Sequence, residues 1–356
     1  MRYTLYSEND FCLRRRFLAL PEGLYPPERR TQDRAELTAL LCGEHPLSAD
    51  LAVYPFLALD ENDQSAARCM LALCPGDENG YVGFFESEDA PDAAALVLGA
   101  AAEKAKLFGR SRLVGPCSAS FWLGSRFKIS NFREYYTGEP NNMAYYPRLW
   151  EACGFRVTDR YVSHHMRVPT DADVREEAVR RLEAARAAGY DFRTITLRTF
   201  DDSLRDICAL LTRLYSDLPG FQEITERQFV TLFSPLRYVL DHEMVKLVYY
   251  HGALAACAVC IPNYGALAAR DRSLRDTAAL LRMRRAPGEY VIPYMGVAPE
   301  HAGLGSALTE LLRQELQRKN AKSVTAPIRD GEVPGDLCRV LKTHETAYVL
   351  MAKEWI

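Results

Sequence analysis

The sequence lacks any apolar run that approaches the roughly 18 residues a helix needs to cross a bilayer. Its opening stretch, MRYTLYSENDFCLRRRF, also lacks the apolar core of a signal peptide. We therefore expect a cytoplasmic protein without a membrane partner. An excess of charge of one sign is missing too, because 44 Lys and Arg residues face 47 Asp and Glu residues. Without a broad positive field, nucleic acid is not an expected partner.

Two familiar phosphate-binding patterns are absent. The chain contains no GxxxxGK[ST] motif, and no GxGxxG motif with an acidic residue about twenty positions later. These absences disfavour a P-loop or Rossmann-type nucleotide site.

Cysteines in metal-binding arrays are also missing, although the chain has ten cysteines. Cys257 and Cys260 have CxxC spacing, but no second Cys or His pair follows at a zinc-like distance. On a strand, positions three apart point to opposite faces, which makes shared ligation awkward. We interpret the cysteines as reduced core thiols and expect no metal.

What the chain does have is length and apolar content. It has 356 residues, 48% of them hydrophobic, which is enough for two cores. The charged, helix-patterned segment 171–190 separates two apolar-rich parts. We predict one domain at 1–170, a helical connector at 171–190, and a second domain at 191–356.

Hydrophobic periodicity predicts similar element orders in the two parts. For the second part, with Thr225 as a helix cap and a tight turn at His251 and Gly252, the prediction is: strand 191–200, helices 202–218 and 225–240, strands within 244–263, a helix-prone stretch at 266–286, strand 289–297, a helix after the following glycines, strand 323–328, helix 335–344 and strand 346–355.

The first part repeats this order more loosely. The predicted elements are strands in 51–62, 65–75 and 80–87, a long helix in 90–109, a strand in 111–118, and a closing helix and strand in 145–168. Strands and helices in this order predict an α/β fold of the α+β type, with a mixed twisted sheet and helices on both faces.

A glycine run, MGVAPEHAGLGSALTELL, stands between the strand at 289–297 and an amphipathic helix. A strand that turns into a helix at Gly303, Gly305 and Ser306 leaves backbone N–H groups unpaired and unshielded by side chains. The helix dipole adds partial positive charge there, so a phosphate or pyrophosphate is the natural ligand. Pro299 fixes the turn. The alternative is a helix that merely begins with glycines.

These residues resemble the acyl-CoA binding motif of the GNAT acyltransferases, V-x-P-x-x-[RQ]-x-x-G-x-[GA]. Val297, Pro299, Gly305 and Ala307 match in register, whereas Ala302 replaces the usual Arg or Gln. The first part is similar to the degenerate N-terminal repeat of two-domain GNAT-like proteins in an uncharacterised bacterial group. At its would-be phosphate site stand Glu86, Glu88, Asp89 and Asp92, so we expect one donor site, in the second part only.

The resemblance implies acetyl-CoA as acyl donor, direct attack of an amine on the thioester, and no metal. A backbone N–H of the strand at 289–297 would polarise the carbonyl, with Val297 as the best candidate. The donor-binding residues implied are Met295, Gly296, Val297, Ala302, Gly303, Leu304, Gly305, Ser306 and Ala307.

The catalytic side chains are less defined by pattern. Glu289 and Glu223 are candidate general bases, although a solvated surface role fits each as well. Leu341 stands where many relatives have the tyrosine that protonates the leaving thiolate. Tyr348 and Tyr294 are the substitutes, against the alternative of core tyrosines.

An aromatic and basic cluster lies at 121–138, with Trp122, Arg126, Lys128, Arg133, Tyr135 and Tyr136. Such interleaving can stack single-stranded nucleic acid, but a domain interface or acceptor pocket fits the balanced charge better. His164 and His165 have no other apparent ligands nearby in the sequence and are assigned surface or packing roles.

The sequence thus predicts a cytoplasmic N-acetyltransferase acting on a small-molecule or peptide amine, and it does not indicate the oligomeric state. Two alternatives remain: a non-catalytic acyl-CoA-binding or regulatory module, and a Fem-type aminoacyl transferase, which would need an aminoacyl-tRNA.

Overall fold

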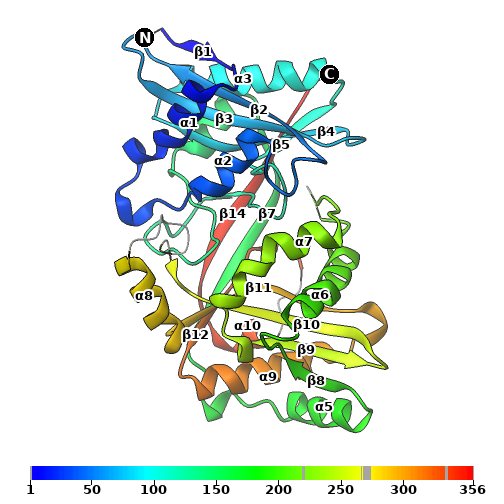
Figure 1. Ribbon diagram of the computed structural model, residues 1–356. Helices are drawn as coiled ribbons and strands as arrows, with labels where there is room; N and C mark the ends of the chain where they lie inside the picture. The colour runs from blue at the N-terminus through cyan, green and yellow to red at the C-terminus, as the bar shows by residue number, and fades with distance from the viewer. Residues whose placement is uncertain (1, 219–220, 266, 268–273, 333–335, 356) are drawn as a thin grey trace.

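A computed structural model describes residues 2–218, 221–265, 267, 274–332 and 336–355. Its strands form one continuous mixed sheet in the order β1-β2-β3-β4-β5-β14-β7-β12-β11-β10-β9-β8, with β6 and β13 attached to β14 and β7. Helices cover both faces, which confirms the predicted α/β class with a mixed sheet (Figure 1). Among the described residues, no helix is long and apolar enough to cross a membrane.

The two halves of the sheet meet through an exchange of strands. The last strand of the first half, β7 (Arg156–Met166), pairs with β12 (Lys322–Thr325) of the second half. The last strand of the chain, β14 (Lys342–Glu354), inserts between β7 and β5 (Arg112–Gly115) of the first half. Figure 1 shows β7 and β14 running side by side through the middle of the molecule.

The first half is built as the periodicity predicts from residue 51 onward. Its further elements are β1 (Thr4–Tyr6), α1 (Phe11–Leu24), α2 (Arg34–Cys42), β2 (Ala52–Leu59), β3 (Ser65–Leu73), β4 (Asn79–Ser87), α3 (Pro91–Leu107), β6 (Phe127–Lys128) and α4 (Tyr146–Ala152). Helices α1 and α2 pack on one face of the sheet and α3 and α4 on the other, where the fully buried Trp150 anchors the core.

The connector contains α5 (Glu176–Ala187), and the second half follows with β8 (Asp191–Thr194), α6 (Phe200–Tyr215), α7 (Glu226–Phe233), β9 (Val245–Tyr250), β10 (Ala253–Pro262), α8 (Leu274–Arg285), β11 (Glu289–Val297), α9 (Leu304–Arg318), β13 (Ile328–Arg329) and α10 (Asp336–Leu341). The Thr225 side chain caps α7 in a capping box with Gln228, as predicted.

Three local predictions differ from the structure. The predicted strand at 191–200 ends at Thr194, since Phe200 already begins α6. The helix predicted at 335–344 ends at Leu341, because Lys342 opens β14. In the helix-prone stretch at 266–286 only α8 is described as a helix, and residues 266 and 268–273 lie outside the described residues.

The cysteine prediction holds in the sheet and fails near the N-terminus. Cys257 and Cys260 are both buried and belong to clusters on opposite faces, so they do not form a shared site. Cys12 and Cys42, in contrast, are exposed rather than core residues, because they lie on the outer faces of α1 and α2. All ten cysteines are free thiols.

The Glu36 carboxyl on α2 provides a test of pH-dependent stability. Burial, with the neighbouring Asp33, raises the pKa of Glu36 from 4.5 to about 7. A carboxyl with a raised folded-state pKa stabilises the fold only while protonated, so stability is lost as pH rises from 4.5 toward 7. Above pH 7, we expect Glu36→Gln to unfold at a higher temperature than wild type. Since 36% of the Glu36 side chain stays exposed, water screening holds the gain to about 1 kcal/mol.

Thermal unfolding across pH measures this effect. The two curves should converge below about pH 4.5, where wild-type Glu36 is protonated even in the unfolded chain. A constant offset at every pH would show that the gain comes from packing and not from the ionised carboxyl.

Candidate functional site

Strands β11 and β12 separate halfway along β11. They pair in parallel from Glu289 opposite Lys322 to Ile292 opposite Thr325, and Ala326 N then donates to Ile292 O at 3.0 Å. Beyond Ile292, the described strand pairings join β11 only to β10, as far as Val297. The sheet therefore opens on the side of β11 that β12 has left.

At alternate residues, the backbone N–H groups of β11 point into this opening. Ala298 N donates to Ala255 O of β10 at 2.8 Å, which sets the phase of the ladder. Because alternate residues of an antiparallel strand face the partner, the N–H groups of Met295 and Val297 point away from β10. The Met295 N–H lies against the Tyr215 hydroxyl at the end of α6, while burial raises the pKa of Tyr215.

The N-terminus of α9 follows directly and has no side-chain cap. Gly303 is the N-cap residue and has no side chain to accept from the first amides of the helix. Leu304 and Ala307 are buried and anchor the turn, while Ala302 and Gly303 are exposed and Gly305 and Ser306 are half-buried. A Cβ added at Gly303 or Gly305 would meet nothing within 4 Å beyond its chain neighbours and the helix's own backbone, so no other element covers the chain at these two positions.

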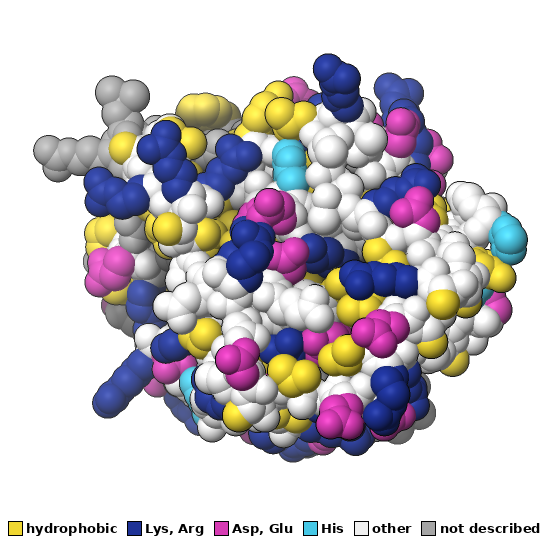
Figure 2. All heavy atoms as spheres, turned by 90° about the horizontal axis from the view of Figure 1, so that it is seen from below, with side chains coloured by type: hydrophobic (Ala, Val, Ile, Leu, Met, Phe, Trp, Pro, Cys, Tyr) yellow, Lys and Arg dark blue, Asp and Glu magenta, His cyan; other side chains and the backbone are white. Residues whose placement is uncertain are grey.

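A recess of about 240 Å³ adjoins this turn. It is lined by Ser306 of α9 and by Arg175, Glu177, Ala178 and Arg181 at the start of α5, which packs along α9. Arg181 pairs with Glu177 at 2.6 Å, which partly neutralises its charge. An anion at the α9 N-terminus would meet helix amides and arginines together. The face seen in Figure 2 otherwise mixes basic and acidic side chains without a large patch of either sign.

The corresponding region of the first half is closed. After β5, Cys117 N donates to Val82 O of β4 at 2.8 Å, and a Cβ at Gly83 would lie 2.1 Å from Cys117 O. The backbone after β5 therefore stays in contact with β4 as far as Gly83. Of the acidic residues predicted to crowd that site, Glu86 instead turns into the core, where it accepts from Tyr146 at 2.7 Å and Tyr25 at 2.9 Å.

Of the two candidate bases, Glu289 lies at the far end of β11, and Glu223 follows Gln222, whose carbonyl accepts from Trp122 Nε1. Glu289 begins β11 and accepts from Asn263 Nδ2 at 2.5 Å, eight residues and therefore about 26 Å of strand before Val297. Glu223 is exposed in the loop between α6 and α7. Glu332 lies in the turn after β13, and its charge adds to burial in raising the pKa of Tyr215. Sequence spacing gave no signal for Glu332.

Tyr294 lies at the opening, inside an aromatic cluster that joins the halves. Trp122 from the first half packs against Tyr294, with ring centroids 6.4 Å apart, and against Phe221, Phe229 and Phe233 around α7. Its Nε1 donates to Gln222 O at 2.9 Å. Burial raises the pKa of Tyr294 to about 12, although the Arg126 charge opposes the rise. The aromatic and basic segment thus contributes to the contact between the halves, as its composition predicts.

The indole N–H of Trp122 is one link between the halves that can be removed alone. Trp122→Phe keeps an aromatic ring in the cluster but leaves Gln222 O without its donor, so we expect a loss of about 1–2 kcal/mol. Denaturant unfolding measures it. Trp355→Phe removes a comparable bond, from Nε1 to Arg110 O at 2.8 Å, away from this junction. If Trp122→Phe weakened donor binding and Trp355→Phe did not, the Trp122 cluster would be shown to shape the opening.

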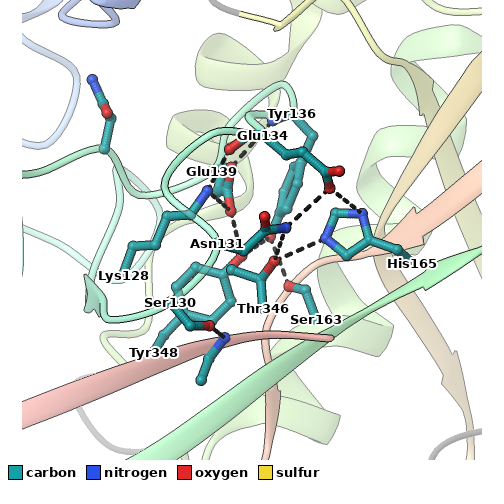
Figure 3. Close-up of polar contacts among 12 residues, drawn as sticks. Lys128, Ser130, Asn131, Glu134, Tyr136, Glu139, Ser163, His165, Thr346 and Tyr348 are labelled. Atoms are coloured by element: carbon teal, nitrogen blue, oxygen red, sulfur yellow. Dashed lines mark hydrogen bonds and ion pairs between the residues drawn. The ribbon is translucent and has the colours of Figure 1, made fainter. Parts of the chain in front are cut away.

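Tyr348 lies in a buried polar network between the halves and not at the opening. Its hydroxyl donates to Glu139 Oε1 at 2.5 Å and lies 3.2 Å from the Tyr136 hydroxyl, while Lys128 Nζ pairs with the same Glu139 oxygen at 2.8 Å (Figure 3). Burial raises the pKa of Glu139 and lowers that of Lys128. Leu341 is buried at the end of α10, in the core beneath α9.

His165 has two partners, His344 and Glu134, that the sequence analysis did not predict. His165 on β7 stacks on His344 of β14, with ring centroids 4.2 Å apart and planes 10° apart. Glu134 lies beside both rings, 2.8 Å from His344 Nε2 and 3.8 Å from His165 Nδ1. His164 points to the other side and meets Glu345 at 3.2 Å.

Comparisons with known proteins identify this architecture. A tandem GNAT protein from the clavulanic acid biosynthesis pathway aligns over 99% of this chain and 98% of its own, with a TM-score of 0.54 and 15% identity. A GCN5-related glucosamine N-acetyltransferase region of a fungal multi-domain GH3 β-N-acetylglucosaminidase aligns over 99% of this chain and 38% of its own, with a TM-score of 0.56 and 12% identity. The chain therefore has the tandem GNAT fold.

Two curated proteins match the sequence at low identity. Protein YghO of Escherichia coli K12 is 23% identical over 330 residues, which cover 88% of this chain and 83% of YghO. The bacterial ceramide synthase of Caulobacter vibrioides is 24% identical over 190 residues, 53% of this chain, and the match spans only 49% of the synthase. No family model matches the sequence.

Proposed function

We propose that the protein is an acyl-CoA-dependent N-acyltransferase with its donor site in the second half. The observation that carries the proposal is the opening beside β11 that leads directly to the uncapped N-terminus of α9. The GNAT fold of the neighbours and the adjoining arginine recess support the same site. The closed counterpart in the first half supports a single donor site per chain.

The proposed arrangement follows from the backbone. The diphosphate of coenzyme A would lie against the amides from Gly303 to Ala307, close to Arg175 and Arg181. The pantetheine arm would run along β11, whose Met295 and Val297 N–H groups point into the opening. The Val297 N–H would then polarise the thioester carbonyl and stabilise the oxyanion.

The reaction is a direct transfer. The amine nitrogen forms a bond to the carbonyl carbon, the carbon–sulfur bond breaks, and the coenzyme leaves as a thiolate. The amine loses one proton, and the thiolate gains one. The Tyr215 hydroxyl accepts from the Met295 backbone, and the Tyr294 ring lies 6.3 Å from the Tyr215 ring between centroids, whereas Tyr348 is held in the network with Glu139. Glu332 is the candidate to accept the amine proton, through water.

We propose two candidate acyl donors, the second with its own acceptor class. Acetyl-CoA is the first donor to test, since both solved neighbours are described as GNAT or N-acetyltransferase proteins. The likeness to a ceramide synthase favours a second candidate, in which a longer acyl chain is transferred to a long-chain amine. The acceptor would enter beside the Trp122 cluster, where both halves meet at the end of β11.

Thiol release tests the proposal. Acetyl-CoA and palmitoyl-CoA are each incubated with the protein and a panel of small amines, peptides with free N-termini and sphinganine, and free coenzyme A is measured. Amine-dependent release with either donor supports transfer, and the amine that gives it names the acceptor class. Donor binding without release from any amine would favour a non-catalytic acyl-CoA-binding module. Binding of tRNA at moderate salt, without acyl-CoA binding, would favour an aminoacyl transferase instead.

A further inference from the structure

Three side chains that can ligate a metal meet on one face of the sheet where β7 and β14 pair. His165 lies on β7, His344 on β14 and Glu134 in the loop after β6, and one ligand atom of each lies within 4.8 Å of the others. Figure 3 shows Glu134 directed at His165 above the two strands. The cluster is separate from the opening at β11, and the proposed transfer reaction does not use it.

The hydrogen bonds around His344 determine which of its nitrogens carries a proton. The Thr343 hydroxyl donates its single hydrogen to His165 O at 3.0 Å. The same oxygen lies 3.0 Å from His344 Nδ1 and must therefore accept, so Nδ1 carries the proton. In neutral His344 the other nitrogen, Nε2, then presents a lone pair to Glu134 Oε2 at only 2.8 Å. The two atoms are compatible at this distance when they share a proton or when both bind one metal cation.

His165 is held in a similar way. Its Nε2 lies 2.9 Å from the Thr346 hydroxyl, and its Nδ1 faces Glu134 Oε2 at 3.8 Å. Asn131 Nδ2 donates to Glu134 Oε2 at 3.0 Å and to Thr346 at 3.1 Å. Each imidazole thus has a threonine hydroxyl on its outer nitrogen and the carboxylate on its inner nitrogen. This is how metal-binding histidines are oriented by their surroundings.

We propose that Glu134, His165 and His344 bind one divalent transition-metal cation, with Zn²⁺ as the best match. Two imidazole nitrogens and one carboxylate oxygen are ligands that zinc accepts at about 2.0–2.2 Å, with a fourth position left for water. The cation would be bound by His344 Nε2 and Glu134 Oε2 together, instead of a proton shared by these two atoms. Glu134 and His344 are half exposed, at 54% and 43% of their side chains, so the metal can enter from solvent.

Bound metal would tie three segments together. The loop with Glu134 continues to Tyr136 and Glu139, which belong to the buried network at the junction, while β7 and β14 come from different halves. Metal binding should therefore raise the melting temperature of the whole protein, since a ligand that binds only the folded state stabilises it.

The test uses the full chain without an affinity tag, after dialysis against EDTA. Zn²⁺ is added by equilibrium dialysis and counted by elemental analysis, and Co²⁺ is added in parallel as a spectroscopic probe. We expect one tightly held Zn²⁺ per chain, a higher melting temperature, and the intense visible bands of Co²⁺ in a four- or five-coordinate site. His344→Gln and Glu134→Gln, both at exposed positions, should each weaken Zn²⁺ binding at least about tenfold, as expected for loss of one ligand.

The matched control is His251→Asn, which removes another exposed histidine at the β9–β10 turn, where asparagine tolerates the positive φ of 48°. It should bind Zn²⁺ as wild type does. Wild-type protein that binds neither metal would overturn the proposal, and NMR would then show His344 as an imidazolium paired with Glu134. Equal Zn²⁺ binding by wild type and His344→Gln would also overturn it.

Discussion

Gly305→Glu is expected to weaken acyl-CoA binding at least about 100-fold, which is a loss of about 2.7 kcal/mol or more. The new side chain would project from the first turn of α9, where an added Cβ meets no atom of another element within 4 Å. Its carboxylate would take the position of the diphosphate and repel the remaining phosphate charge. Isothermal titration of acetyl-CoA and palmitoyl-CoA into both proteins measures the change.

Gly99→Glu is the matched control for this substitution. Gly99 lies on α3, the counterpart of α9 in the first half, and an added Cβ there also meets nothing within 4 Å. Donor affinity should not change, because backbone closes the neighbouring strands of that half. Unaltered affinity in Gly305→Glu would place the donor elsewhere and end the assignment of α9, whereas loss of affinity in both variants would indicate a general effect of added charge.

Lys128→Met is expected to destabilise the fold by about 3–5 kcal/mol, the range for leaving a buried charge without its partner. Lys128 and Glu139 have side chains only 4% and 1% exposed, with Nζ and Oε1 2.8 Å apart. Without the ammonium group, the partners that remain to Glu139 among the described residues are the Tyr348 hydroxyl and the Tyr136 amide. Equilibrium unfolding in denaturant gives the difference.

An exposed pair gives the comparison. Lys106→Met breaks the pair of Lys106 with Glu103, whose side chains are 41% and 72% exposed, and should cost less than about 1 kcal/mol. The double variant Lys128→Met, Glu139→Gln removes both charges and should recover part of the loss. If Lys128→Met unfolded like Lys106→Met, Glu139 would have to be protonated and neutral in wild type.

Much of the fold could be predicted from hydrophobic periodicity. The strand at 289–297 matches β11 residue for residue, and the long helix in 90–109 contains α3. In such elements the spacing of the apolar residues depends only on which face is buried. The exchange of β7 and β14 was not predictable, because a strand that pairs in its own half and one that pairs across halves carry the same alternating pattern. Pairing partners are set by tertiary contacts.

The site shows the same division. The glycines before α9 indicated an uncapped helix N-terminus, a local property that the chain near Gly303 specifies by itself. Arg175 and Arg181 gave no such signal, since a charged helix looks like a solvated connector until it is packed against α9. His165 could be seen in the sequence but not its neighbour His344, 179 positions later by their numbering. Only the pairing of β7 with β14 brings the two together.

The order of strands at the centre also governs how this protein can be divided. A fragment that ends before Lys342 would lack the strand between β5 and β7, and so would leave two unpaired edges inside the first half. A fragment that begins after the connector would in turn lack the neighbour of β12. Neither half contains a complete sheet. A substitution in the last strand of one half therefore also changes the packing inside the other half.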